Sequence, residues 1–138
     1  MSAKDVFHNA VKNALQKEGW LITDDPLFIR FGGINIYIDL GAEKVIAAEK
    51  DGEKIAVEIK SFLAPSAISE FHLALGQFLN YRLVLERQDP ERILYLAITV
   101  DAYDTFFTLP FTQMAIQHHQ LKLIVYEPET EVIVQWEK

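Results

Sequence analysis

The sequence predicts an α/β fold in which a mixed sheet is flanked by helices. Three observations indicate this class: an amphipathic first segment, a series of short β-rich segments over residues 20–60, and an almost continuously apolar segment over 92–100 that follows a second helical segment. The last pattern is typical of a strand that is buried on both faces of its sheet. The 138 residues match the common size of one domain, and no repeat or linker divides them, so we expect a single domain over 1–138.

Helical spacing of apolar residues predicts three helices. The first is expected over residues 3–18, because Ser2 begins a capping pattern and an apolar stripe follows it. The second is expected to begin after Ser66, its N-cap, and to end near residue 86. A short third helix is expected near 110–119. The expected apolar face of the second helix consists of Ile68, Phe71, Leu75, Phe78 and Leu79.

Segments rich in β-branched and aromatic residues, bounded by Gly, Pro and Asp, predict the strands. They are expected at residues 20–23, 27–31, 34–40, 45–50, 54–60, 92–100, 121–126 and 130–136. Asp51-Gly52 is a strong signal for a hairpin turn between the fourth and fifth of these. The resulting order, α-β-β-β-β-β-α-β-α-β-β, is an antiparallel meander followed by a strand–helix–strand crossover.

Composition and charge restrict the function. The absence of cysteine excludes disulfides and thiolate metal sites, and the absence of a signal peptide or a long apolar run predicts a cytoplasmic protein with no membrane partner. The net charge of −7 argues against strong, general DNA binding by this domain alone, because binding to phosphates usually needs a basic surface. A small phosphate-contacting rim has the following candidates, with scattered surface cations as the alternative: Lys4, Lys12, Arg30, Lys44, Lys50 and Lys54.

The segment Ile-Ala-Val-Glu-Ile-Lys at 55–60 places two charged side chains on one face of an expected strand. Side chains alternate between faces, so Glu58 and Lys60 point to the same side as Ala56. A buried, unpaired charge is unfavourable, and a bound cation would offset this at Glu58. Asp39 ends an apolar segment, and its carboxylate meets that of Glu58 if the two strands pair.

These residues are candidate ligands for Mg²⁺ or Mn²⁺. Mg²⁺ prefers oxygen ligands and keeps several waters, so the carboxylates of Asp39 and Glu58 and the backbone carbonyl of Ile59 suffice as protein ligands. Such an ion polarises a phosphoryl oxygen and activates an attacking water, which Lys60 would orient. The alternative is an exposed strand on which Glu58 and Lys60 form a surface ion pair of little energetic consequence.

Asp39 followed by Glu58-Ile59-Lys60 in an α-β-β-β-α-β order resembles the PD-(D/E)xK, or restriction-endonuclease-like, superfamily, with isoleucine in place of the motif's proline. The segment Gln-Phe-Leu-Asn-Tyr at 77–81 resembles the Q-x-x-x-Y motif of several of its nuclease branches. Across nearly its full length, the chain is also similar to the XisH family of cyanobacteria. The similar stretches are DVFHNAVKNAL, GWLITDDP, IYIDLGAEKVIAAEK, KIAVEIKSF and LGQFLNYR.

The superfamily resemblance implies a role for each matching residue. Asp39 and Glu58 would bind the metal, and Lys60 would be the catalytic lysine. Gln77 would position the site or the nucleic acid, with Tyr81 on the same helix face; a surface position for both is the alternative. Glu18 is a candidate accessory acid, with simple solvation as the alternative. His8 is interpreted as a core or capping histidine.

The XisH resemblance implies participation in DNA rearrangement, because the family is named for controlling excision of the fdxN element during heterocyst development. The implied partners are DNA, a companion protein of XisI type and a separate site-specific recombinase; a homodimer is also compatible. Two functions remain open: a Mg²⁺-dependent DNA endonuclease, or a non-catalytic regulator with an endonuclease fold. Four apolar residues could bind the companion, although we favour their packing at the sheet edge: Phe106, Phe107, Leu109 and Phe111.

Overall fold

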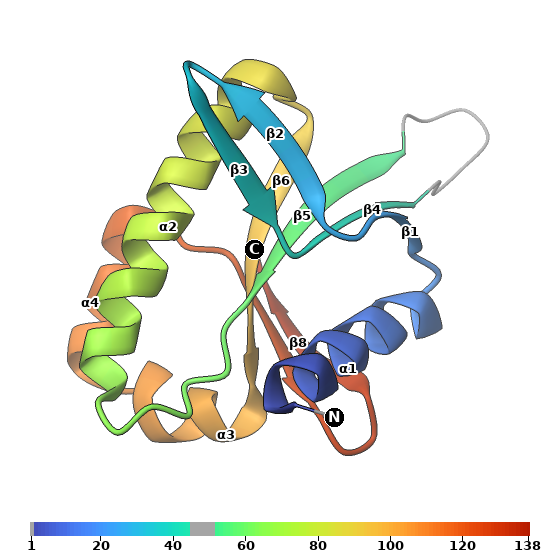
Figure 1. Ribbon diagram of the computed structural model, residues 1–138. Helices are drawn as coiled ribbons and strands as arrows, with labels where there is room; N and C mark the ends of the chain where they lie inside the picture. Colours follow the sequence, from blue (N-terminus) through green and yellow to red (C-terminus); the bar gives the residue numbers. More distant parts are fainter. Residues whose placement is uncertain (1, 45–51) are drawn as a thin grey trace.

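The computed structural model describes residues 2–44 and 52–138. Its helices are α1 (Ala3–Lys17), α2 (Ala67–Gln88), α3 (Val100–Ala102), the π-helical turn η1 (Tyr103–Phe107) and α4 (Pro110–His119). Its strands are β1 (Leu21–Asp24), β2 (Leu27–Phe31), β3 (Ile34–Ile38), β4 (Leu40–Lys44), β5 (Glu53–Ile59), β6 (Arg92–Thr99), β7 (Leu123–Glu127) and β8 (Val132–Glu137). Figure 1 shows a twisted sheet with helices on both sides, which confirms the predicted α/β class.

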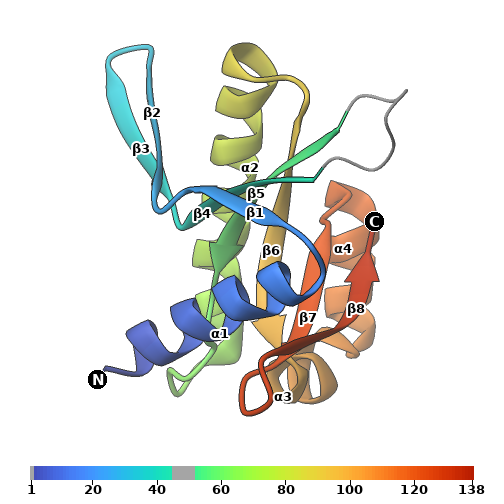
Figure 2. The same cartoon turned by 90° about the vertical axis from the view of Figure 1, so that its right-hand side faces the viewer.

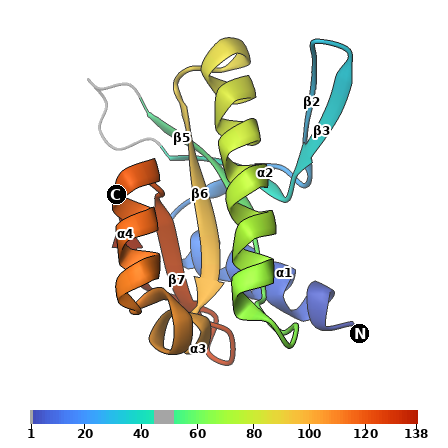
Figure 3. The same ribbon diagram turned by 90° about the vertical axis from the view of Figure 1, so that its left-hand side faces the viewer.

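Six strands form the main sheet in the order β1-β4-β5-β6-β7-β8. The strands β1, β4 and β5 are an antiparallel meander, β5, β6 and β7 run parallel, and β8 is antiparallel to β7. Helix α2 connects β5 to β6, as expected of a parallel crossover. The views from two further sides show α1 against one face of the sheet and α2 with α4 against the other (Figures 2 and 3).

The two faces of the sheet carry two separate apolar clusters. Ile55 and Val57 of β5 pack into the cluster that α1 covers, whereas Ala56 packs into the cluster that α2 covers. This is the alternation predicted for the segment 55–60, and it places Glu58 on the α2 side. Within the described residues, no helix is long and apolar enough to cross a bilayer.

Strands β2 and β3 form a separate hairpin. The prediction of one continuous strand over 34–40 is wrong, because this segment is divided between the hairpin and the main sheet. Strand β3 ends at Ile38, and the chain then leaves the hairpin at Asp39 and enters the main sheet as β4. The sequence of β4 has little β propensity, because it contains glycine, alanine, glutamate and lysine; pairing on both sides, with β1 and β5, makes it a strand. The predicted strand 45–50 and the first residue of the predicted turn lie outside the described residues.

The helices differ from prediction in the residues that they bury. In α2, Phe71 and Phe78 are buried as expected, but Ile68 is exposed and Ala74 takes its place in the core. Phe106 and Phe107 are packed, as we favoured, because both rings are buried against other aromatic rings in the π-helical turn that follows β6 and α3, and the alternative use of these two as an exposed interface does not hold. The other two residues of that group, Leu109 and Phe111, are exposed.

Candidate functional site

Pairing of β4 with β5 brings the two predicted acids together. Leu40 lies opposite Val57, so the residue before β4 and the residue after Val57 meet across the pair. The backbone N–H of Ile59 donates to Asp39 Oδ2 at 2.7 Å, and the N–H of Asp39 donates to Glu58 Oε1 at 3.4 Å. Glu58 therefore accepts from the backbone of Asp39, and Asp39 accepts from the backbone of the residue that follows Glu58. The two carboxyl groups lie at the same end of the sheet.

Glu58 is the most deeply buried charged group of this site, with 7% of its surface exposed. Burial, and next the nearby charge of Asp39, raise the pKa of Glu58 to about 7 against the opposing effect of Lys60. The Lys60 ammonium lies 3.4 Å from Glu58 Oε2. One ammonium group thus balances two neighbouring carboxyl groups only in part, which leaves the pair suited to a further positive charge.

The donor set consists of hard oxygen atoms. The N–H of Ile59 points to Asp39. In an antiparallel pair, the N–H and the C=O of one residue point toward the same neighbouring strand, so the Ile59 carbonyl is directed to the Asp39 side. Across the described parts of the chain, no three or more His, Asp or Glu side chains gather as a metal site. Two carboxylates, one carbonyl and waters fit Mg²⁺, which retains water readily, better than they fit an ion that demands a complete set of protein ligands.

One face of α2 lies over these acids. Burial raises the pKa of Tyr81, and the negative charges of Glu58 and Asp39 raise it further, which shows that the phenol is near both. Gln77 lies one turn earlier on the same face. Its carbonyl oxygen is buried, and no described residue donates a hydrogen bond to it. The structure brings both residues to the site side of α2, whereas their functional roles stay predictions.

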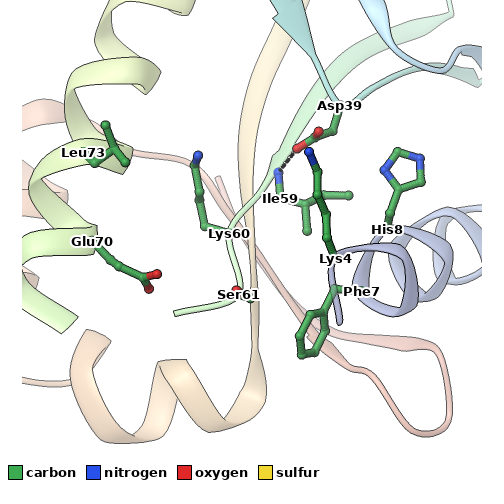
Figure 4. Close-up of a pocket in the computed structure, with 9 residues that line it drawn as sticks. All are labelled: Lys4, Phe7, His8, Asp39, Ile59, Lys60, Ser61, Glu70 and Leu73. Carbon is green, nitrogen blue, oxygen red and sulfur yellow. Dashed lines mark hydrogen bonds between the residues drawn. The ribbon is translucent and has the colours of Figure 1, made fainter. Parts of the chain in front are cut away.

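A pocket of about 330 Å³ opens beside the acids, between α1 and α2. Figure 4 shows α2 side chains on one side of it and α1 side chains on the other, with Asp39 and Lys60 between them. Its lining residues are Lys4, Phe7, His8, Asp39, Ile59, Lys60, Ser61, Glu70 and Leu73. The sequence reasoning gave no site role to Phe7, His8, Ser61 or Leu73. Lys4 and His8 are one helical turn apart on α1, and this spacing could have predicted that they share a helix face.

His8 is neither a core nor a capping residue. It is half-buried, and its Nε2 atom lies 2.7 Å from Asp25 Oδ1 in the connection between β1 and β2. Lys12, one turn further along α1, donates to the other oxygen of Asp25 at 2.9 Å. The ring is therefore held at the pocket wall by a contact between residues that are distant in sequence.

Glu18 is not brought to the site. It caps the far end of α1, where its carboxylate accepts a hydrogen bond from Trp136 Nε1 at 3.0 Å. His8 and Glu18 are ten residues apart on this helix, which corresponds to roughly 15 Å along its axis. The position of Glu18 thus does not support an accessory role for it.

Among the described residues of the predicted cationic rim, only Lys4 lines the pocket. Arg30 is exposed on β2, Lys44 lies over the ring of Trp20, and Lys54 lies 4.0 Å from Asp89. Lys50 lies outside the described residues. The rim is therefore not continuous within the described part of the chain.

Comparisons with known proteins agree with this fold. A family model described as XisH protein matches residues 1–134. The crystal structure of an XisH family protein from Nostoc punctiforme PCC 73102 has a TM-score of 0.89 and 54% sequence identity, and the match covers 97% of this chain and 100% of that chain. The crystal structure of an fdxN element excision controlling factor protein from Anabaena variabilis has a TM-score of 0.87 and 53% identity, with 97% and 99% covered. Among curated proteins, no match was found. The chain belongs to the XisH family.

Proposed function

We propose that this protein is a metal-dependent DNA endonuclease-like factor that acts in site-specific DNA rearrangement, with Mg²⁺ or Mn²⁺ as its cofactor. The observation that carries the proposal is the convergence of Asp39, Glu58 and Lys60 at one end of the sheet, beside a pocket. The relative from Anabaena variabilis is described as an fdxN element excision controlling factor, and we propose the same process for this chain.

Asp39, Glu58 and the Ile59 carbonyl would hold the cation, which when bound polarises a phosphoryl oxygen and acidifies a water. The chain's own groups then have separate tasks. Lys60, no longer the main counter-charge of Glu58, is free to donate hydrogen bonds to the attacking water or to a phosphate oxygen. Gln77, whose side-chain oxygen has no donor among the described residues, can accept a hydrogen bond from that water.

The topology supports the PD-(D/E)xK superfamily as the origin of this chemistry. Helix α1, the meander β1-β4-β5, the crossover α2 and the parallel strand β6 follow the order α-β-β-β-α-β, with the hairpin β2-β3 inserted in the meander. Asp39 directly precedes β4 and Glu58 lies in β5, in agreement with the motif.

The second candidate function is that of a non-catalytic regulator, which the net charge of −7 favours. In this case the fold would bind the XisI-type companion and direct a separate recombinase without cutting DNA. Under either proposal the protein takes part in DNA rearrangement in the cytoplasm.

Plasmid nicking in Mg²⁺ or Mn²⁺ separates the two functions. We expect the wild-type protein to nick a supercoiled plasmid, with and without its companion protein as parallel arms, and D39N, E58Q and K60M to lose on the order of 10²-fold or more in rate. The matched control is E91Q, which neutralises an exposed glutamate that the structure places away from the pocket. Cation binding at Asp39 and Glu58 without nicking in any arm would contradict the endonuclease and support the regulator.

A further inference from the structure

The first two turns of α1 form one wall of the pocket beside the acids. Lys4, Phe7 and His8 line this wall, and Glu70 and Leu73 of α2 line the wall opposite (Figure 4). Asp39 and Lys60 line the same pocket. The α1 wall is therefore the part of the pocket that supplies donors from outside the predicted motif.

His8 is fixed more firmly than a surface histidine. Its Nε2 atom is bonded to Asp25 at 2.7 Å, and Lys12 holds the second oxygen of the same carboxylate at 2.9 Å. Burial would raise the pKa of Asp25, but the hydrogen bonds and charges of Lys12 and His8 outweigh it and lower the pKa overall, so Asp25 is ionised at neutral pH. Ionised Asp25 only accepts, so Nε2 donates to it and Nδ1 is the ring atom left for a ligand in the pocket. Nδ1 donates to an anionic ligand when the ring carries both protons, and no described residue bonds to it.

The two walls differ in charge. The α1 wall carries the ammonium of Lys4 and the imidazole of His8, whereas the α2 wall carries the carboxylate of Glu70. An anionic ligand that reaches Asp39 and Lys60 would thus be repelled from α2 and attracted to α1. The pocket volume of about 330 Å³ lies at the lower end of the range for small-molecule sites, which is room for a group of nucleotide size.

We propose that Lys4 and His8 form a phosphate-binding subsite, which holds a backbone phosphate of the DNA strand next to the phosphodiester presented to Asp39 and Glu58. The inference rests on the proposed function and adds the surface by which the substrate is oriented. Asp25 is a positioning residue in this subsite, because it acts on the ligand only through His8. The subsite also explains how a chain of net charge −7 can bind DNA locally, with two donors placed beside the reacting group.

The test is DNA binding measured by fluorescence anisotropy, with Ca²⁺ in place of Mg²⁺ to suppress cleavage and KCl varied. We expect K4Q and H8Q each to lower the affinity for a labelled duplex roughly tenfold. K4Q should also reduce the slope of log K against log salt concentration by about 1, as for the loss of one phosphate contact. The matched controls are H72Q and K138Q, which alter an exposed histidine and an exposed lysine that do not line the pocket.

The positioning role of Asp25 has its own readout. D25N should weaken binding, and the double variant H8Q/D25N should bind no more weakly than H8Q alone, because Asp25 acts through His8. Thermal unfolding of every variant checks that the fold is intact. A further loss of affinity in the double variant would show that Asp25 acts by another route.

The outcomes separate this inference from the proposed function. Affinities of K4Q and H8Q equal to those of the controls would overturn the subsite, whatever the nicking result. Binding that weakens in K4Q and H8Q while the wild type cuts nothing would support the subsite and contradict the endonuclease. If the wild-type protein binds no DNA in Ca²⁺, the subsite is overturned, while Mg²⁺ titration of the same preparation still tests the cation site.

Discussion

Glu58 places a carboxyl group where water reaches little of it, with a second carboxyl group adjacent. The pKa of Glu58 is about 7 in the folded protein, against 4.5 for an ordinary glutamate. The folded state therefore binds more protons than the unfolded state between these two values. This group favours folding most below about pH 4.5, and its contribution falls as the pH rises to about 7. At pH 8 the ionised Glu58 thus destabilises the cation-free protein by something on the order of 3 kcal/mol.

The substitution E58Q removes this unfavourable charge. We expect E58Q to raise the free energy of unfolding of the cation-free protein at pH 8 by up to about 3 kcal/mol, and to change it little at pH 4.5. Urea unfolding in the presence of EDTA measures both values. E91Q, which alters an exposed glutamate, should have little effect at either pH. If E58Q were less stable than the wild type at pH 8, this would contradict the claim that the ionised Glu58 carboxylate destabilises the folded protein.

Binding of a divalent cation should release the proton of Glu58. Because the cation binds the ionised carboxylate, we expect the affinity for Mg²⁺ to rise with pH up to about 7 and to level off above it. Isothermal titration at pH 6 in two buffers of different ionisation enthalpy measures the proton released, which should approach one per ion. An affinity that is independent of pH between 5 and 7, with no proton release, would show that Glu58 is not a ligand.

At the scale of elements, β4 holds Asp39 in place and is itself held by close packing. A Cβ atom at Gly41 would lie 2.8 Å from Asp24 Oδ2 and 3.0 Å from Arg92 Nη1, so any side chain there requires Asp24 and Arg92 to shift. Arg92 is buried and donates to the Ile55 carbonyl at 2.9 Å and to Asp89 at 2.9 Å. Glycine at position 41 thus allows β4 to lie close to both Asp24 of β1 and the buried Arg92.

The substitution G41A should therefore disturb both the fold and the site. We expect it to lower the free energy of unfolding by about 2 kcal/mol, through overpacking against Asp24 and Arg92, and to weaken Mg²⁺ binding because Asp39 lies two residues away. The control is G76A in α2, where a Cβ meets no atom within 4 Å and alanine should stabilise the helix by up to about 1 kcal/mol. Equal effects of the two substitutions would contradict the close packing at β4.

The elements that sequence predicts well are those whose own residues determine them. Strand β5 alternates between two apolar clusters, so its pattern predicts both the strand and the shared face of Glu58 and Lys60. Strand β4 was not predicted because its residues have little β propensity. It is a strand because it pairs with β1 on one side and with β5 on the other. The strands β2 and β3 were expected from their residues, but their separation from the main sheet as a hairpin depends on long-range packing against α2.

At the scale of the whole molecule, the candidate site lies where two layers meet. Asp39, Glu58 and Lys60 come from the end of the sheet, and the pocket beside them is closed by α1 on one side and α2 on the other. The motif residues could be predicted because they are close in sequence to predicted strands. The contact that holds His8 at the pocket wall could not, because its partner Asp25 is 17 residues away and reaches it only in the folded chain.

The most direct test of a shared cation site is anomalous diffraction from crystals of the wild-type protein soaked in Mn²⁺ at pH 8. We expect one strong peak within roughly 2.0–2.3 Å of oxygen atoms of both Asp39 and Glu58, and loss of that peak in E58Q. A peak that contacts neither carboxylate, or no peak in the wild-type crystals at saturating Mn²⁺, would contradict the metal site on which the proposed chemistry depends.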